Sequence, residues 1–217
     1  MSAPVPEQRA IGILGGTFDP VHIGHIRLAI EATELLNFRA VHFVPLNVPN
    51  HRAPPLVDGA ARFEMLAGAL DGERLIADDR ELVRGGTSYS IDTLTSMRAE
   101  FPAAPLCLLL GADAFHGLCS WHRWDELLDV GHLVVVDRPI AATPLDPRLE
   151  MLIDARGTAA AADLHSAPCG RIFFQPIPLL PISSTDIRAR IAAGRDIRFL
   201  VPPSAERMIV AQQLYRT

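Results

Sequence analysis

The chain of 217 residues contains no lysine, so all 20 of its basic residues are arginine. The absence of lysine excludes a Walker A phosphate loop, because that loop needs its lysine on the β- and γ-phosphates. It also excludes any mechanism that passes through a covalent lysyl intermediate. If the protein handles phosphates, it must use arginine, histidine and backbone N–H groups. Genomic base composition is the alternative explanation for the missing lysines.

Other absences narrow the class of protein. No apolar run approaches the roughly 20 residues that a membrane helix needs, and the start "MSAPVPEQRA" has no basic or apolar signal region. We therefore expect a disordered leader over 1–9 and no membrane partner. The three cysteines are scattered and have no metal spacing, which indicates a reducing, cytoplasmic location without disulfides. A net charge of −5 gives no support to a nucleic-acid partner.

The pattern of strands and helices predicts an α/β fold. Apolar strand candidates alternate with helix candidates, and the central strands are continuously apolar, as in parallel sheets covered on both faces. We expect one domain over 1–217, with a Rossmann-like, doubly wound parallel sheet, helices on both faces and a C-terminal helical cap over 183–217. The expected strands are 10–14, 40–46, 74–78, 80–84, 106–113, 132–139 and 171–177. The expected helices are 26–38, 60–70 (capped by Asp58), 91–101, 122–130, one within 140–170, 183–194 and 202–215.

The segment "GILGGTFDPVHIGH" (12–25) lies where the first strand gives way to a helix. Gly15 and Gly16 let the backbone approach a ligand closely, and the N-terminus of the helix favours an anion. His22 and His25, three residues apart, fall on one face of the first turn. Two imidazoles there could hydrogen-bond phosphate oxygens and stabilise charge that develops in a transition state. Taken singly, a loop histidine is more often solvated or locally bonded.

This segment resembles the first signature of the nucleotidylyltransferase superfamily, whose hallmark is H-x-G-H. The resemblance covers the eleven residues "GGTFDPVHIGH". In that superfamily the two histidines contact the phosphates of a nucleoside triphosphate. The resemblance therefore implies catalytic roles for His22 and His25, and ATP contacts from four residues before them: Gly15, Gly16, Thr17 and Phe18.

The segment "ISSTDIR" (182–188) predicts a second helix N-terminus. Ser183 is its expected N-cap, Thr185 lies in the first turn and Arg188 lies one turn further on. A capped helix start with an arginine suits a phosphate, although by itself the pattern also fits an ordinary capped helix. The segment resembles the second signature of the same superfamily, which grips the triphosphate. That resemblance implies a catalytic role for Arg188 and phosphate contacts from Ser183 and Thr185.

The segment "NVPNHR" (47–52) follows the second expected strand. His51 and Arg52 could reach the same phosphates, although alone the segment is an ordinary surface loop. In bacterial nicotinate-nucleotide adenylyltransferases the corresponding segment commonly has P-P-H followed by lysine or arginine. Here Asn50 replaces a proline, which loosens the loop but keeps both polar groups.

Two further segments, "TSYSIDTL" (87–94) and 111–139, resemble the nicotinate-nucleotide adenylyltransferase branch. By that resemblance, Trp121 stacks on the pyridine ring and the backbone N–H groups of Ser90 and His122 receive the nicotinate carboxylate. Gly111 and Asp113 would contact ribose. Trp124 is expected to pack in the core, and Arg138 could face the nucleotide. The stretch 156–170 matches nothing in the family and is expected to be a surface insertion.

The resemblance implies an adenylyltransferase whose substrates are ATP and nicotinate mononucleotide. The 5′-phosphate of the mononucleotide would attack the α-phosphorus of ATP in line, giving nicotinate adenine dinucleotide and pyrophosphate, with Mg²⁺ carried on the ATP phosphates. Three alternatives stay open: nicotinamide mononucleotide as the acceptor, another phosphate ester, or a non-catalytic nucleotide-sensing module. A homo-oligomer is also left open.

Overall fold

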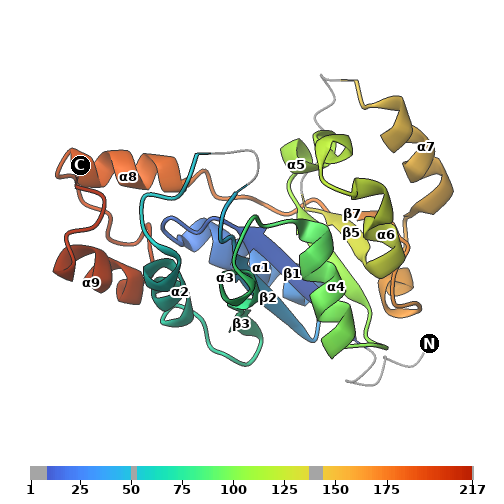
Figure 1. Ribbon diagram of the computed structural model, residues 1–217, viewed down its shortest axis with the longest axis horizontal. Coiled ribbons are helices and arrows are strands. Elements are labelled where there is room, and N and C mark those ends of the chain that lie inside the picture. The colour runs from blue at the N-terminus through green and yellow to red at the C-terminus, as the bar shows by residue number, and fades with distance from the viewer. Residues whose placement is uncertain (1–8, 50–52, 137–143, 217) are drawn as a thin grey trace. The chain divides into compact units, whose positions relative to one another are not determined.

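The computed structural model describes residues 9–49, 53–136 and 144–216. Its strands form a seven-stranded sheet in the order β3-β2-β1-β4-β5-β7-β6 (Figure 1). The pairs β1–β4, β4–β5, β5–β7 and β6–β7 are all parallel. The predicted α/β class with a Rossmann-like parallel sheet is therefore confirmed.

The elements follow the alternation that the sequence predicts. The strands are β1 (Ile11–Gly16), β2 (Ala40–Pro45), β3 (Leu75–Ala77), β4 (Leu106–Leu110), β5 (His132–Val135), β6 (Gly157–Thr158) and β7 (Ile172–Phe174). The α-helices are α1 (Ile23–Leu35), α2 (Gly59–Ala67), α3 (Arg80–Arg84), α4 (Ser90–Glu100), α5 (Ala112–His116), α6 (Leu127–Val130), α7 (Pro147–Arg156), α8 (Ser184–Ala192) and α9 (Pro203–Ala211). None of these described helices has the length and apolar character needed to cross a membrane.

The chain groups into two compact units. Unit 1 comprises Met1–Leu14, Glu31–Val41 and Tyr89–Ile177, and unit 2 comprises Gly15–Ile30, His42–Ser88 and Pro178–Thr217. The prediction of a single domain stays a prediction. In unit 1 every residue of β4 and β5 is buried, which accounts for their continuously apolar sequences. In unit 2, α2 packs against α9 (Figure 1).

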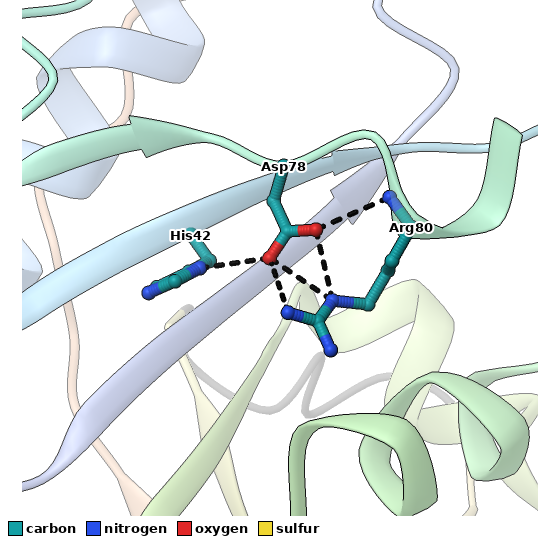
Figure 2. Close-up of polar contacts among 3 residues, drawn as sticks. All are labelled: His42, Asp78 and Arg80. Carbon is teal, nitrogen blue, oxygen red and sulfur yellow. Dashed lines mark hydrogen bonds and ion pairs between the residues drawn. The ribbon is translucent and has the colours of Figure 1, made fainter. Parts of the chain in front are cut away.

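Helix α2 begins as predicted, because the Asp58 side chain accepts a hydrogen bond from the Ala61 N–H at 2.9 Å. The predicted strand 80–84 is wrong: these residues form helix α3. Five residues with two adjacent apolar side chains fit either structure, and here the turn at Asp78 favours the helix. Its carboxylate accepts hydrogen bonds from the Arg80 backbone N–H and guanidinium and lies 2.8 Å from the His42 ring (Figure 2).

The ion-pair cluster His42, Asp78 and Arg80 lies within unit 2. Burial works to raise the pKa of the Asp78 carboxyl, but the bonds from His42 and Arg80 outweigh it and lower the pKa to about 2. The carboxylate is therefore charged at neutral pH and fixes the connection between β3 and α3.

The stretch 156–170 is not the surface insertion that the sequence suggested. It supplies the edge strand β6, which pairs with β7, and its Leu164 is completely buried. The ring of His165 accepts a hydrogen bond from the Ala10 N–H at 3.0 Å. These contacts anchor the stretch to unit 1, although most of its residues are exposed or half-buried. A sequence without a recognisable strand pattern could not indicate this anchoring.

The expectation for Trp124 is also wrong, because this side chain is half-buried rather than packed in the core. The guanidinium of Arg148 lies over its ring, 5.5 Å from the ring centroid. A cation above an indole face is a favourable contact. The Trp124 ring therefore contacts Arg148 near the surface of unit 1 instead of packing in the core.

Candidate active site

The two histidines of the H-x-G-H motif stack on each other at the start of α1, as their spacing predicts. Their ring centroids are 3.6 Å apart and the rings are inclined by 21°. The backbone N–H of His22 donates to Nδ1 of His25 at 3.3 Å. Nδ1 of His25 is therefore unprotonated, and the proton of a neutral ring sits on Nε2. His25 thus keeps Nε2–H as a donor for a ligand.

Both histidines are neutral at physiological pH in the free protein. Burial lowers the pKa of His22 to about 4. Burial, together with the proximity of His22, holds the pKa of His25 well below its usual range. Nδ1 of His22 is buried and has no hydrogen-bond partner among the described residues. A buried, unpaired ring nitrogen is costly unless a ligand satisfies it.

The stacked rings leave little room for a side chain at Gly24. A Cβ at this position would lie 3.0 Å from Nδ1 of His22, closer than ordinary van der Waals contact. Phe18 packs against the histidine pair. Its buried ring meets the His25 ring edge-on, with the ring centroids 4.9 Å apart. The predicted ATP contact of Phe18 can therefore come only from its backbone.

The loop between β1 and α1 is held by side chains from distant parts of unit 2. The Asp19 carboxylate accepts hydrogen bonds from the Tyr215 hydroxyl and from the Leu56 N–H, each at 2.8 Å. The backbone carbonyl of Pro20 accepts from the Ser184 hydroxyl at 2.9 Å. One oxygen of Asp19 thus binds the segment before α2 and the other binds the C-terminal segment.

Helix α8 begins as predicted, with the Ser183 side chain accepting from the Asp186 N–H. Arg188 donates through Nη1 to the carbonyl of Asp19 at 2.7 Å and through Nη2 to the Thr185 hydroxyl at 3.2 Å. These bonds orient the guanidinium and tie it to the loop that carries the histidines. The structure thus brings together His22, His25, Thr185 and Arg188, residues from two motifs far apart in sequence.

Arg62 is a buried residue of this region that sequence reasoning missed. Its guanidinium donates to the carbonyls of Thr17, Leu46 and Val57 at 2.7, 2.7 and 3.0 Å. The available signal was its place on the buried face of α2, where it precedes Met65 and Leu66 at helical spacing. An arginine on an apolar face usually has a specific set of acceptors.

The residues predicted to receive the pyridine ring lie in unit 1. Ser90 is the first residue of α4, whose opening N–H groups have no intrahelical acceptor. The ring of the preceding Tyr89 contacts the ring of His122, with centroids 4.3 Å apart. Trp121, next to His122, is half-buried.

Arg123 lies in the turn that carries Trp121 and His122. It adopts a left-handed conformation with φ 51°, which is uncommon for a residue other than glycine. Its guanidinium makes two hydrogen bonds to the Glu126 carboxylate, at 2.8 and 2.6 Å. This ion pair is exposed at both side chains and therefore contributes only modestly to holding the turn.

The predicted ribose contacts also lie in unit 1, directly after β4. Gly111 precedes α5 and Asp113 belongs to its first turn, and both are exposed. A Cβ at Gly111 would meet no described atom within 4 Å, so the space beside this backbone is open. His51, Arg52 and Arg138 lie outside the described residues.

No described residues form a group of three or more histidine, cysteine, aspartate or glutamate side chains that could hold a metal ion. The polar groups gathered at the histidine loop are instead donors, which suits an anion.

The cytidylyltransferase-like family model matches residues 13–190. A protein of Pseudomonas putida named "probable nicotinate-nucleotide adenylyltransferase" is 47% identical over 210 residues, covering 96% of this chain and 95% of that protein. A Chromohalobacter salexigens protein of the same name is 44% identical, covering 99% of this chain and 100% of its own length.

Solved structures share the fold. The nicotinic acid mononucleotide adenylyltransferase of Plasmodium falciparum, complexed with NaAD, superposes with a TM-score of 0.69 at 18% identity, covering 95% of this chain and 97% of that one. The chain carries both signature segments of the superfamily, one before α1 and one at the start of α8, and its relatives match nearly its whole length. The protein therefore belongs to the nicotinate-nucleotide adenylyltransferase family of cytidylyltransferase-like enzymes.

Proposed function

We propose that the protein joins ATP and nicotinate mononucleotide to give nicotinate adenine dinucleotide and pyrophosphate, a step of NAD biosynthesis. The observation that carries the proposal is the assembly of His22, His25, Thr185 and Arg188 around the loop Asp19–Pro20. The relatives at 44–47% identity carry the name of this activity.

The reaction is an in-line substitution at phosphorus. An oxygen of the mononucleotide's 5′-phosphate forms a bond to the α-phosphorus of ATP, while the bond from that phosphorus to the β-bridging oxygen breaks and pyrophosphate leaves. The attacking phosphate is already an anionic nucleophile, so no general base is required. Catalysis then consists of positioning the substrates and stabilising the charge that moves onto the leaving group.

The histidine loop and α8 would bind the triphosphate. Neutral His25 donates through Nε2–H, and a bound polyanion raises the pKa of both histidines by supplying the opposite charge that the free protein lacks. Arg188, already oriented by Asp19 and Thr185, would supply the permanent positive charge. Backbone groups from Gly15 to Phe18, and the start of α8 at Ser183, would complete the contacts.

We propose that Mg²⁺ arrives on the ATP phosphates and keeps mainly phosphate and water ligands. Mg²⁺ dehydrates reluctantly and commonly binds through substrate phosphates with few protein ligands. The donor-rich character of the histidine loop supports this assignment, because such groups bind the phosphates rather than the metal.

In unit 1, Trp121 would stack on the pyridine ring, while the N–H groups of Ser90 and His122 would receive the nicotinate carboxylate. Gly111 and Asp113 would contact ribose. A carboxylate held by backbone donors binds more strongly than a neutral amide in the same place. The ion pair of Arg123 with Glu126 adds modest support to this selectivity, since it lies in the turn that carries the His122 backbone.

The test is pyrophosphate release with MgATP and either nicotinate mononucleotide or nicotinamide mononucleotide. We expect turnover with the acid and a kcat/KM that is lower with the amide. Equal kcat/KM values would overturn the assigned selectivity. ATP binding by calorimetry without pyrophosphate release from either acceptor would instead support a nucleotide-sensing module.

A further inference from the structure

The buried guanidinium of Arg62 lies beneath the histidine loop without reaching solvent, since only 1% of the residue is exposed. Its three acceptors come from separate points of unit 2. Thr17 directly follows β1, Leu46 directly follows β2, and Val57 ends the connection from β2 to α2. One side chain therefore fixes the backbone after two strands and before one helix.

Burying this cation is costly. Burial lowers the pKa of Arg62, while the charges of Asp19, Tyr215 and Asp58 act in the opposite direction. An apolar side chain of similar volume would fill the same space without that cost. What the guanidinium adds is a rigid, planar set of donors that binds three carbonyls at once.

The direction of one carbonyl matters for a ligand. In a trans peptide the C=O and the N–H of the same unit point in opposite directions. Because the Thr17 carbonyl points at the buried Arg62, the Phe18 N–H of that peptide points away from Arg62. This N–H belongs to the loop that ends in His22 and His25, and the Phe18 ring itself is buried against His25.

We propose that Arg62 is a positioning residue for nucleotide binding, which orients the Thr17–Phe18 peptide so that the Phe18 N–H donates to a phosphate of the bound nucleotide. The inference rests on the proposed function, because it assigns the triphosphate to this loop. Arg62 does not touch the nucleotide and acts only through the backbone that it holds.

Arg98 provides a matched control in the same chain. Its guanidinium also donates only to backbone carbonyls, among them Ala104 at 2.6 Å, Val130 at 3.0 Å and Pro168 at 2.7 Å. Burial lowers its pKa as well. These acceptors lie in unit 1 and precede β4, β5 and β7, so Arg98 has no part in the histidine loop.

The experiment compares Arg62→Lys with Arg98→Lys. We expect both variants to lower Tm, because lysine cannot satisfy all the carbonyls that arginine holds. Only Arg62→Lys should raise the Kd of a non-hydrolysable ATP analogue, by about 10- to 100-fold, measured by calorimetry below both Tm values. The KM for nicotinate mononucleotide should stay at the wild-type value in both variants.

A second readout follows the Phe18 amide by NMR hydrogen exchange. The ATP analogue should slow exchange at this amide in the wild type and in Arg98→Lys, but not in Arg62→Lys. If Arg62→Lys does not fold, Arg62→Gln takes its place, since its amide brings two N–H donors without burying a charge.

Wild-type analogue affinity in the folded Arg62 variant, or an unprotected Phe18 amide in the wild type, would overturn the proposal. Both readouts measure only nucleotide binding, so their outcome does not depend on whether the protein catalyses the proposed reaction. A wild-type protein that binds the analogue but releases no pyrophosphate would refute the reaction and leave the role of Arg62 intact.

Discussion

At the scale of single residues, the stacked histidines are most informative through their hydrogen bonds. His25 receives the His22 N–H on Nδ1, so its remaining nitrogen is a donor in the neutral ring. Removing such a donor from a charge-stabilising site typically lowers the rate by about 10²–10³. We therefore predict that His25→Ala reduces kcat for pyrophosphate release by that factor.

We expect His25→Ala to reduce kcat because a hydrogen-bond donor to the reacting phosphates is removed, and not because the variant is unfolded. Loss of a ring that packs against His22 and Phe18 should lower the urea midpoint, but circular dichroism at the assay temperature should still match that of the wild type. A folded variant with nearly normal kcat would remove His25 from the mechanism.

His22 gives a pH dependence whose sign differs from that of a paired histidine. Its pKa is about 4 in the folded protein and about 6.5 in an unfolded chain. Between these values the unfolded state binds the extra proton, so the free energy of unfolding falls as pH falls from 6.5 towards 4. We predict that His22 accounts for roughly 2–3 kcal/mol of that loss.

The measurement is urea unfolding at pH 7 and pH 4.5 for the wild type and for His22→Asn, which keeps a polar side chain but does not titrate. The variant should lose less stability than the wild type on acidification. The same loss in both proteins would show that the ring is not buried neutral as described.

The residues that sequence reasoning found are those whose role is local. His22 and His25 share a face because of their spacing, and Ser183 caps α8 within its own segment. Arg62 and Tyr215 were missed because their partners are distant in sequence: Thr17 lies 45 residues from Arg62, and Asp19 lies 196 residues from Tyr215. No periodic pattern encodes such pairings.

At the scale of elements, the first turn of α1 depends on a glycine for a steric reason. A Cβ at Gly24 would lie 3.0 Å from the His22 ring, so the ring would have to shift by a few tenths of an ångström within its stack. We predict that Gly24→Ala lowers kcat/KM for ATP by roughly tenfold or more, because small misplacements of catalytic groups are costly. Alanine is otherwise favourable within a helix.

Gly117, at the end of α5, is the matched control for Gly24. A Cβ there would have its nearest contact at 3.6 Å, an ordinary distance, and the backbone φ of −84° suits alanine. Gly117→Ala should therefore keep wild-type kinetics. Unchanged kinetics in Gly24→Ala as well would show that the ring stack is not needed for the reaction.

The elements could be predicted where the pattern is long or capped, and not where it is short. Helix α2 and the strands β4 and β5 follow directly from Asp58 and from continuous apolar runs. Helix α3 has five residues and was mistaken for a strand, since its conformation depends on the Asp78 carboxylate. The edge strand β6 has two residues, too few for any periodicity.

At the scale of the whole molecule, the all-arginine composition has more than one use. Arg62 and Arg98 satisfy buried or partly buried carbonyls, and Arg123 forms an ion pair with Glu126 in a turn. Among these four, we assign only Arg188 to phosphate binding. The absence of lysine leaves arginine as the permanent side-chain cation available for phosphate, but it does not distinguish a binding arginine from a structural one.

The contacts assigned to the triphosphate and those assigned to the pyridine ring lie in different units, and this division can be tested. The residues assigned to the triphosphate lie in 15–25 and 183–188 of unit 2, and those assigned to the pyridine ring lie in 90–122 of unit 1. A bound ligand slows the local opening of the segments it contacts. We predict that an ATP analogue alone slows hydrogen exchange in 15–25 and 183–188, and that nicotinate mononucleotide alone slows it near Ser90 and His122.

Exchange measured by mass spectrometry on peptides from both units separates the assignments without requiring turnover. Peptides of α7, to which no substrate contact is assigned, serve as the internal reference. If the mononucleotide slowed exchange in 183–188 and left 118–124 unchanged, the triphosphate and pyridine assignments would have to be swapped.

The ribose contacts assigned to Gly111 and Asp113 give a further test. The ATP analogue should also slow exchange after β4, and this signal should vanish with inorganic triphosphate, which has no ribose.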